Sequence, residues 1–92
     1  MDIVKSHVVV SLAGRDKGKL FLALDTDGEY VLIADGRGRK QEKPKRKKRK
    51  HIQFVSESNS YAAAKIRNGE KVLNSEIRKA LAEFLGEPKG QD

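Results

Sequence analysis

The chain has 92 residues and a net charge of +7, and charged residues make up 36% of it against 37% apolar residues. Its length fits one domain, or one domain with an appendage, and the absence of cysteine excludes a disulfide scaffold and any thiolate metal site. No apolar run approaches the roughly 20 residues that span a bilayer, and the N-terminus lacks signal-peptide features, so we expect a cytoplasmic protein without a membrane partner.

Four short strands are predicted from the alternation of apolar residues, because a period of two is typical of a strand. In the first, Val8, Val10 and Leu12 share one face. Turn signals rich in Asp and Gly separate the strands, and several short strands with regular turns favour a small barrel, whose closure removes exposed edges. The predicted strands cover residues 7–12, 19–25, 29–35 and 51–55.

The last third of the chain changes period and predicts helices. A short helix over residues 60–67 is capped by Ser60 and ended by Asn68-Gly69. A longer helix runs through Leu85 and begins at a cap formed by Asn74 or Ser75, with Glu76 at its positive end and Gly86 after its last turn. Its apolar stripe, which we expect to pack on the barrel, consists of Ile77, Ala80, Leu81, Phe84 and Leu85.

The predicted fold class is therefore mainly β with α: a small barrel of four to five strands followed by one or two C-terminal helices. We expect a barrel over residues 1–56 that carries a basic loop over 37–51. A helical extension over 57–86 packs on it, and a disordered tail covers 87–92.

Positive charge is concentrated in two places. The glycine-containing turn at 14–19 lies between two predicted strands, and residues 37–50 hold ten cations against Glu42 alone, a net of +9. The rest of the chain carries −2. Such a block repels itself unless a polyanion neutralises it, and Pro44 keeps it from forming a helix. The two segments indicate binding to a phosphate backbone, most simply that of RNA.

Gly14 and Gly18 would let the turn backbone approach a phosphate closely. Within the basic loop, the segment Lys43–Lys50 would thread along or into an RNA groove and become ordered as it binds. His51 is either a phosphate or base contact or ordinary strand surface, and His7 is expected to be structural. The candidate RNA-binding residues are Gly14, Arg15, Lys17, Gly18, Lys19, Arg37, Arg39, Lys40, Lys43, Lys45, Arg46, Lys47, Lys48, Arg49, Lys50 and His51.

Few aromatic residues are available for base stacking, and most of them fall on predicted core faces, so recognition is expected to depend on shape and charge. The turn at 14–19 is not a nucleotide-binding P-loop, since three residues separate its glycines and Leu20 follows the lysine. Asp25-Thr26-Asp27-Gly28 lacks the spacing of a calcium loop. We expect no enzyme, catalytic residue, metal, cofactor or small-molecule substrate.

The segment from Val8 to Lys19, followed by an apolar strand ending near Asp25, resembles a KOW motif. Gly18 falls on the glycine that defines this motif, and Arg15, Lys17 and Lys19 fall on its usual cations. KOW modules occur in ribosomal proteins and in transcription-elongation factors of the Nus type. A longer match is similar to small bacterial relatives of the large-subunit ribosomal proteins of the fourteen-e family; it includes Tyr30–Gly36, the basic segment, Lys50-His51-Ile52 and, more loosely, Ile77–Leu81.

This resemblance implies an SH3-like barrel that binds large-subunit ribosomal RNA, with ribosomal proteins as further partners and a ribosome-associated location. The chain departs from the family in having a short helical extension in place of a long tail. Two alternatives stay open. In one, the barrel or the 77–85 stripe docks on RNA polymerase or another protein and the basic loop gives only nonspecific attraction. In the other, the protein coats DNA, although no groove-reading helix is evident.

Overall fold

The five strands within residues 2–86 belong to one antiparallel sheet in the order β4-β3-β2-β1-β5. The computed structural model describes residues 2–86, so the tail predicted at 87–92 lies outside the described residues. The elements are β1 (Val8–Ser11), β2 (Leu20–Asp27), β3 (Tyr30–Ala34), β4 (Lys45–Lys48), the 3₁₀ turn η1 (Arg49–His51), β5 (Ile52–Ser56), α1 (Tyr61–Arg67) and α2 (Asn74–Phe84).

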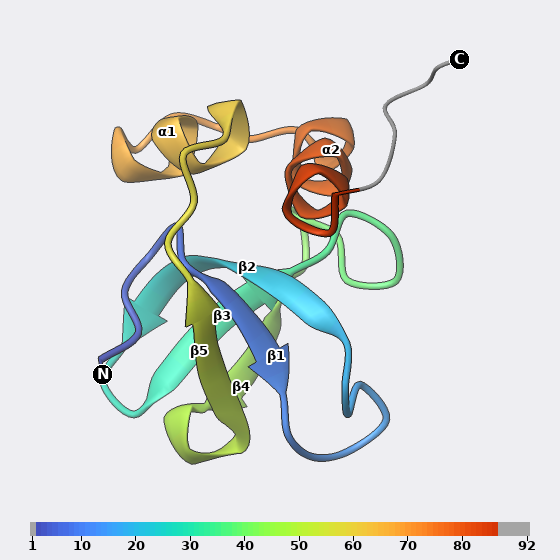
Figure 1. Cartoon of the computed structure of the whole chain (residues 1–92). Helices are drawn as coiled ribbons and strands as arrows, with labels where there is room; N and C mark the ends of the chain where they lie inside the picture. Colours follow the sequence, from blue (N-terminus) through green and yellow to red (C-terminus); the bar gives the residue numbers. More distant parts are fainter. Residues whose placement is uncertain (1, 87–92) are drawn as a thin grey trace.

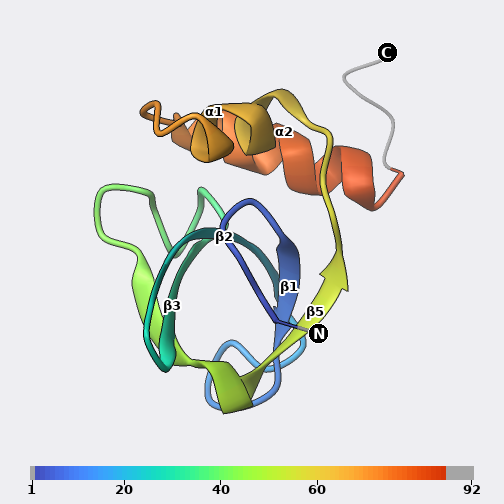
Figure 2. The ribbon, with the colours of Figure 1, turned by 90° about the vertical axis from the view of Figure 1, so that its left-hand side faces the viewer.

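The sheet curls strongly, and the strands form a ring when viewed along the barrel (Figure 2). Register shifts between Val8 and Val9 of β1 and between Ala23 and Asp25 of β2 lie on the two central strands. Such irregularities bend a strand and increase its twist, which is how a short sheet curves. The two edge strands, β4 and β5, are joined by η1. The expected class, a small barrel followed by helices, is confirmed with five strands and two helices.

Both faces of the sheet are covered, which explains why β1 is a continuous run of valines. Inside the barrel, Val9 and Phe21 are fully buried. On the outer face, Val8 and Leu22 lie beneath α1 and α2, which rest together on one side of the barrel (Figure 1). The inner cluster comprises Ile3, Val9, Phe21, Ala23, Val31, Ile33 and Ile52; the outer one comprises Val8, Leu22, Ala34, Ala62, Ile66, Val72, Ile77, Ala80 and Leu81.

The two helices begin differently. The Ser60 hydroxyl accepts the Ala63 N–H at 3.1 Å and caps α1, and α1 ends at Asn68 as predicted. For α2 the predicted caps are wrong: the N-cap position is Leu73, whose own N–H donates to the Glu76 carboxylate at 2.8 Å. Asn74 is instead the first residue of the helix, and its side chain forms hydrogen bonds with the loop after β3.

The apolar stripe of α2 is only partly buried. Ile77, Ala80 and Leu81 pack on the sheet, as expected, whereas Phe84 and Leu85 are 40% and 56% exposed. The stripe therefore divides into a buried part near the start of the helix and an exposed part at its end.

The basic loop differs most from the sequence-based expectation. Residues 45–48 form β4, paired with β3 from Lys45↔Ile33 to Lys48↔Tyr30, where a loop that becomes ordered on binding was expected. The run Lys-Arg-Lys-Lys has no apolar alternation, so periodicity could not reveal a strand. It is held by backbone hydrogen bonds to β3 and by the aliphatic stems of its alternate side chains, two of which are half-buried.

Candidate nucleic-acid interface

The candidate interface is centred on the basic turn, residues 14–19 between β1 and β2. The Gly18 N–H donates to the Ser11 carbonyl at 2.8 Å, and Gly14 and Gly18 have φ angles of +78° and +86°. Residues with a side chain rarely adopt these left-handed backbone angles, so glycine at both positions lets the chain reverse tightly. Arg15, Lys17 and Lys19 are exposed on the turn.

One acidic residue in this basic turn points inward. The Asp16 carboxylate accepts Nε and Nη2 of Arg39 at 3.1 and 3.0 Å, and its side chain is only 8% exposed. Arg39 belongs to the loop after β3, where the Asp35 carboxylate accepts the N–H groups of Arg37 and Arg39. The basic turn is thereby fixed against the loop after β3.

On its other side, the start of the turn contacts the segment that contains β4 and η1. Lys47 Nζ donates to the Ala13 carbonyl at 2.8 Å, and the Leu12 N–H donates to the His51 carbonyl at 2.8 Å. Since Ala13 adjoins the basic turn, these contacts bring the turn, the loop after β3 and the β4–η1 segment side by side. Sequence reasoning proposed these segments separately, and the structure brings them together.

Four of the predicted RNA-binding cations have partners within the protein. Besides Arg39 and Lys47, Arg49 donates from Nε to the Gly28 carbonyl at 2.7 Å and from Nη1 to the Ile3 carbonyl at 2.8 Å. The Arg46 guanidinium lies 3.6 Å from the centre of the Tyr30 ring and 3.6 Å from an Asp27 carboxylate oxygen. These side chains therefore help to hold the fold.

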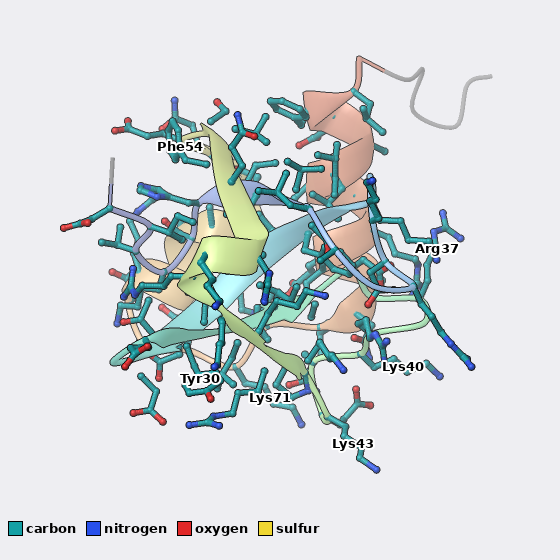
Figure 3. All side chains as sticks on the ribbon, turned by 90° about the horizontal axis from the view of Figure 1, so that it is seen from below. Tyr30, Arg37, Lys40, Lys43, Phe54 and Lys71 are labelled. Atoms are coloured by element: carbon teal, nitrogen blue, oxygen red, sulfur yellow. The ribbon has the colours of Figure 1, made fainter. Side chains whose placement is uncertain are left out.

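The remaining predicted cations have no hydrogen bond or ion pair from their side chains to any residue in the range 2–86. Arg37, Lys40 and Lys43 point away from the barrel, on a side of the molecule remote from Phe54 (Figure 3). Lys48 and Lys50 lie beside the β2–β3 hairpin, because Lys48 pairs with Tyr30. The full set is Arg15, Lys17, Lys19, Arg37, Lys40, Lys43, Lys45, Lys48 and Lys50, of which only Lys45 is half-buried.

The histidines and aromatic residues occupy varied positions. His7 is structural, as expected: its Nδ1 accepts the Val4 N–H at 3.2 Å and its ring meets Phe54 edge-on at 4.8 Å. His51 is half-buried. Among the aromatic rings, Phe21 is fully buried and Phe54 packs against the inner cluster, whereas Tyr61 and Phe84 are 70% and 40% exposed. Tyr61 lies on α1, however, away from the basic turn.

Helix α2 also fixes the loop after β3, which leads into β4. The sequence did not predict this contact. Asn74 accepts the Gln41 N–H at 2.8 Å and donates to the Glu42 carboxylate at 2.7 Å, and Arg78 donates to the Gly36 carbonyl at 2.6 Å. The hydrogen bond from Asn74 is the main cause that lowers the pKa of Glu42.

In comparisons with known proteins, the chain matches no protein-family model and no curated protein. Neither helix in the described part of the chain is long and apolar enough to cross a membrane. Within residues 2–86 there is no group of three or more His, Cys, Asp or Glu side chains that could hold a metal ion.

Proposed function

We propose that this protein binds RNA through the basic turn, the loop after β3 and the β4–η1 segment. The observation that carries the proposal is the position of the turn between the two other basic segments, fixed by Asp16–Arg39 on one side and Lys47–Ala13 on the other. Cations without internal partners on all three segments can then contact neighbouring phosphates of one backbone.

The chemistry of this surface favours recognition of backbone shape. The turn offers Lys and Arg heads together with exposed glycine backbone, and the ring of Tyr30, which pairs with Lys48 of β4, is covered by Arg46. A surface of this kind neutralises phosphates without reading base edges, as in proteins that recognise folded RNA by its shape. The resemblance to KOW-type ribosomal proteins supports large-subunit ribosomal RNA as the target, and hence a cytoplasmic, ribosome-associated location with ribosomal proteins as neighbours.

The competing role as a protein-interaction module is limited by burial of the first part of the 77–85 stripe, since Phe84 and Leu85 at its end remain exposed. Ile77 and Leu81 are 0% and 8% exposed, and both pack in the outer cluster against the sheet. Substituting them would unfold the helical layer, and loss of a partner would then say nothing about docking.

A direct test compares two double variants of equal charge. Lys43→Gln with Lys48→Gln removes two cations from the proposed interface, and Lys5→Gln with Lys79→Gln removes two exposed cations elsewhere. Binding to a labelled RNA hairpin is measured by fluorescence anisotropy at several salt concentrations. We expect the first variant to bind more weakly with a salt slope reduced by roughly two, and the second to bind like wild type. Equal losses in both would contradict the assigned surface.

The ribosomal part of the proposal has its own test. Lysate is sedimented through sucrose gradients at low and high salt, and the protein is followed by immunoblot. Sedimentation with the large subunit at high salt is the expected result and would mark a defined site. Recovery in the light fractions at both salt concentrations would remove the ribosomal assignment.

A further inference from the structure

A groove of about 490 Å³ runs between the basic turn, the loop after β3 and the exposed end of α2. Its volume lies within the roughly 300–1,000 Å³ typical of sites for small organic groups. Its walls come from three separate parts of the sequence, and the residues that line it are Gly18, Lys19, Leu20, Asp35, Arg37, Gly38, Arg78, Leu81, Ala82 and Leu85.

The groove combines an apolar wall with a cationic rim. Leu81 and Ala82 of α2 and Leu85, which follows its last residue, supply apolar surface, and Leu85 is 56% exposed although it is a large aliphatic residue. Lys19 and Arg37 on the rim are exposed and have no side-chain partner among residues 2–86. A ligand that is apolar at one end and anionic at the other would satisfy both sets of groups.

The one carboxylate in the groove, that of Asp35, offsets only one of its three cations, Lys19, Arg37 and Arg78. Asp35 Oδ1 accepts the N–H groups of Arg37 and Arg39 at 2.9 and 3.0 Å, so its charge stabilises the loop. Arg78 is anchored by its hydrogen bond to the Gly36 carbonyl and presents a further positive charge beside the apolar wall. The balance of the groove is cationic.

Gly18 and Lys19 belong both to the groove and to the basic turn. An RNA strand whose phosphates lie along the turn therefore passes the mouth of the groove. A base that is already unpaired costs little to turn out of the strand, whereas a base in a duplex must first be unstacked and unpaired. An unpaired nucleotide thus matches the groove in chemistry and in place.

We propose that the groove holds one unpaired nucleotide of the bound RNA, its base against Leu81, Ala82 and Leu85 and its phosphate between Lys19 and Arg37. This inference rests on the proposed RNA-binding function and adds to it a preference for one kind of RNA. The protein should favour RNA helices interrupted by a bulge over continuous helices of the same sequence.

The test uses two RNA hairpins with the same stem, one of which carries a single-nucleotide bulge. Wild type should bind the bulged hairpin about fivefold to tenfold more tightly, the gain expected from burying roughly 40–60 Å² of apolar surface. Leu85→Ser should abolish this preference and leave binding to the continuous stem unchanged. Phe84→Ser is the matched control, because Phe84 is exposed on the same helix and does not line the groove. Circular dichroism checks that both variants stay folded.

The outcomes separate the two proposals. If wild type binds neither hairpin, the RNA-binding function itself is contradicted. If wild type binds both equally, RNA binding stands and the nucleotide groove is overturned. A preference that survives Leu85→Ser, or that Phe84→Ser removes to the same extent, also overturns the groove.

Discussion

Asp16 and Arg39, 23 residues apart in the sequence, form an ion pair of 3.0 Å that joins the basic turn to the loop after β3. The carboxylate is almost fully buried, and the guanidinium is one-third exposed. The cations of the basic turn repel one another. Asp16, the one acidic residue within the turn, fixes it in place. This contact sets the spacing between two groups of cations in the proposed interface.

We predict that Asp16→Asn lowers the free energy of unfolding by roughly 1–3 kcal/mol, because it leaves the Arg39 guanidinium without its buried charged partner. Asp27→Asn is the matched control: Asp27 is exposed and lies 3.6 Å from Arg46, so its loss should change stability by no more than about 0.5 kcal/mol. Urea unfolding followed by circular dichroism measures both. Equal effects would mean that the Asp16–Arg39 pair does not stabilise the fold.

Gly36 is predicted to be the least replaceable glycine of the loop after β3. Its φ is +78°, and a Cβ there would lie 2.4 Å from the Asn74 carbonyl oxygen on α2. Gly36→Ala should cost about 2–4 kcal/mol, combining an unfavourable backbone with a steric clash. Gly18→Ala, with φ +86° and nothing within 4 Å of the added Cβ, should cost only about 1 kcal/mol in thermal or urea unfolding. A smaller loss at Gly36 than at Gly18 would contradict the packing of this loop on α2.

Two neighbours on β4 should separate stability from RNA affinity. Lys47→Met removes the hydrogen bond to the Ala13 carbonyl and should lower the free energy of unfolding by about 1 kcal/mol. Lys48→Met should leave stability within about 0.5 kcal/mol of wild type and reduce the salt slope of RNA binding by roughly one. Urea unfolding and anisotropy titrations on both variants check this. The opposite pattern would show that the orientation of β4 is wrongly assigned.

The contact between Lys65 and Glu76 predicts a pH dependence of stability. The Leu73 N–H and Lys65 Nζ hold the pKa of Glu76 below its usual 4.5. Glu76 therefore stabilises the fold above about pH 4.5, and this contribution is lost as the pH falls through the lower pKa of the folded state. When the urea midpoint is plotted against pH, the midpoint of Glu76→Gln should fall less steeply on the acid side than that of wild type. Glu57→Gln, at an exposed residue, should show the same fall as wild type.

Glu76 also raises the pKa of Lys65 above 10.5 through its hydrogen bond. The contribution of Lys65 is therefore present below about pH 10.5 and lost as the pH rises through the higher folded value. The same Glu76→Gln variant should lose less stability than wild type on the alkaline side. In this variant, a fall of the urea midpoint on the alkaline side as steep as that of wild type would contradict the pairing.

The strands were predictable where short apolar runs are bounded by turn signals, as in β2 and β3, and the helix over 61–67 was predictable from its Ser60 cap. β4 was not, because its composition carries no apolar period and its pairing with β3 is decided by tertiary contacts. The cap of α2 was missed for a related reason. The Asn74 side chain could cap a helix, but it forms hydrogen bonds with Gln41 and Glu42 instead, and both are distant in sequence.

For the candidate site, the sequence predicted which residues carry charge, but not which of them are already paired. Reversing the charge of residues 45–48 together would include Lys47 and Arg46, whose side chains contact the Ala13 carbonyl and the Tyr30 ring. Such a variant would disturb the fold and the interface at once. The clue that was available is Asp16, the single acidic residue within a basic turn.

The salt dependence of RNA binding by the full chain tests the central claim most directly. The affinity for a labelled RNA hairpin is measured by anisotropy from low to near-physiological salt. The account predicts a linear fall of log affinity with log salt, with a slope that corresponds to several neutralised phosphates and that decreases in the Lys43→Gln, Lys48→Gln variant. No binding at low salt, or binding of equal strength and slope in that variant, would contradict RNA binding through this surface.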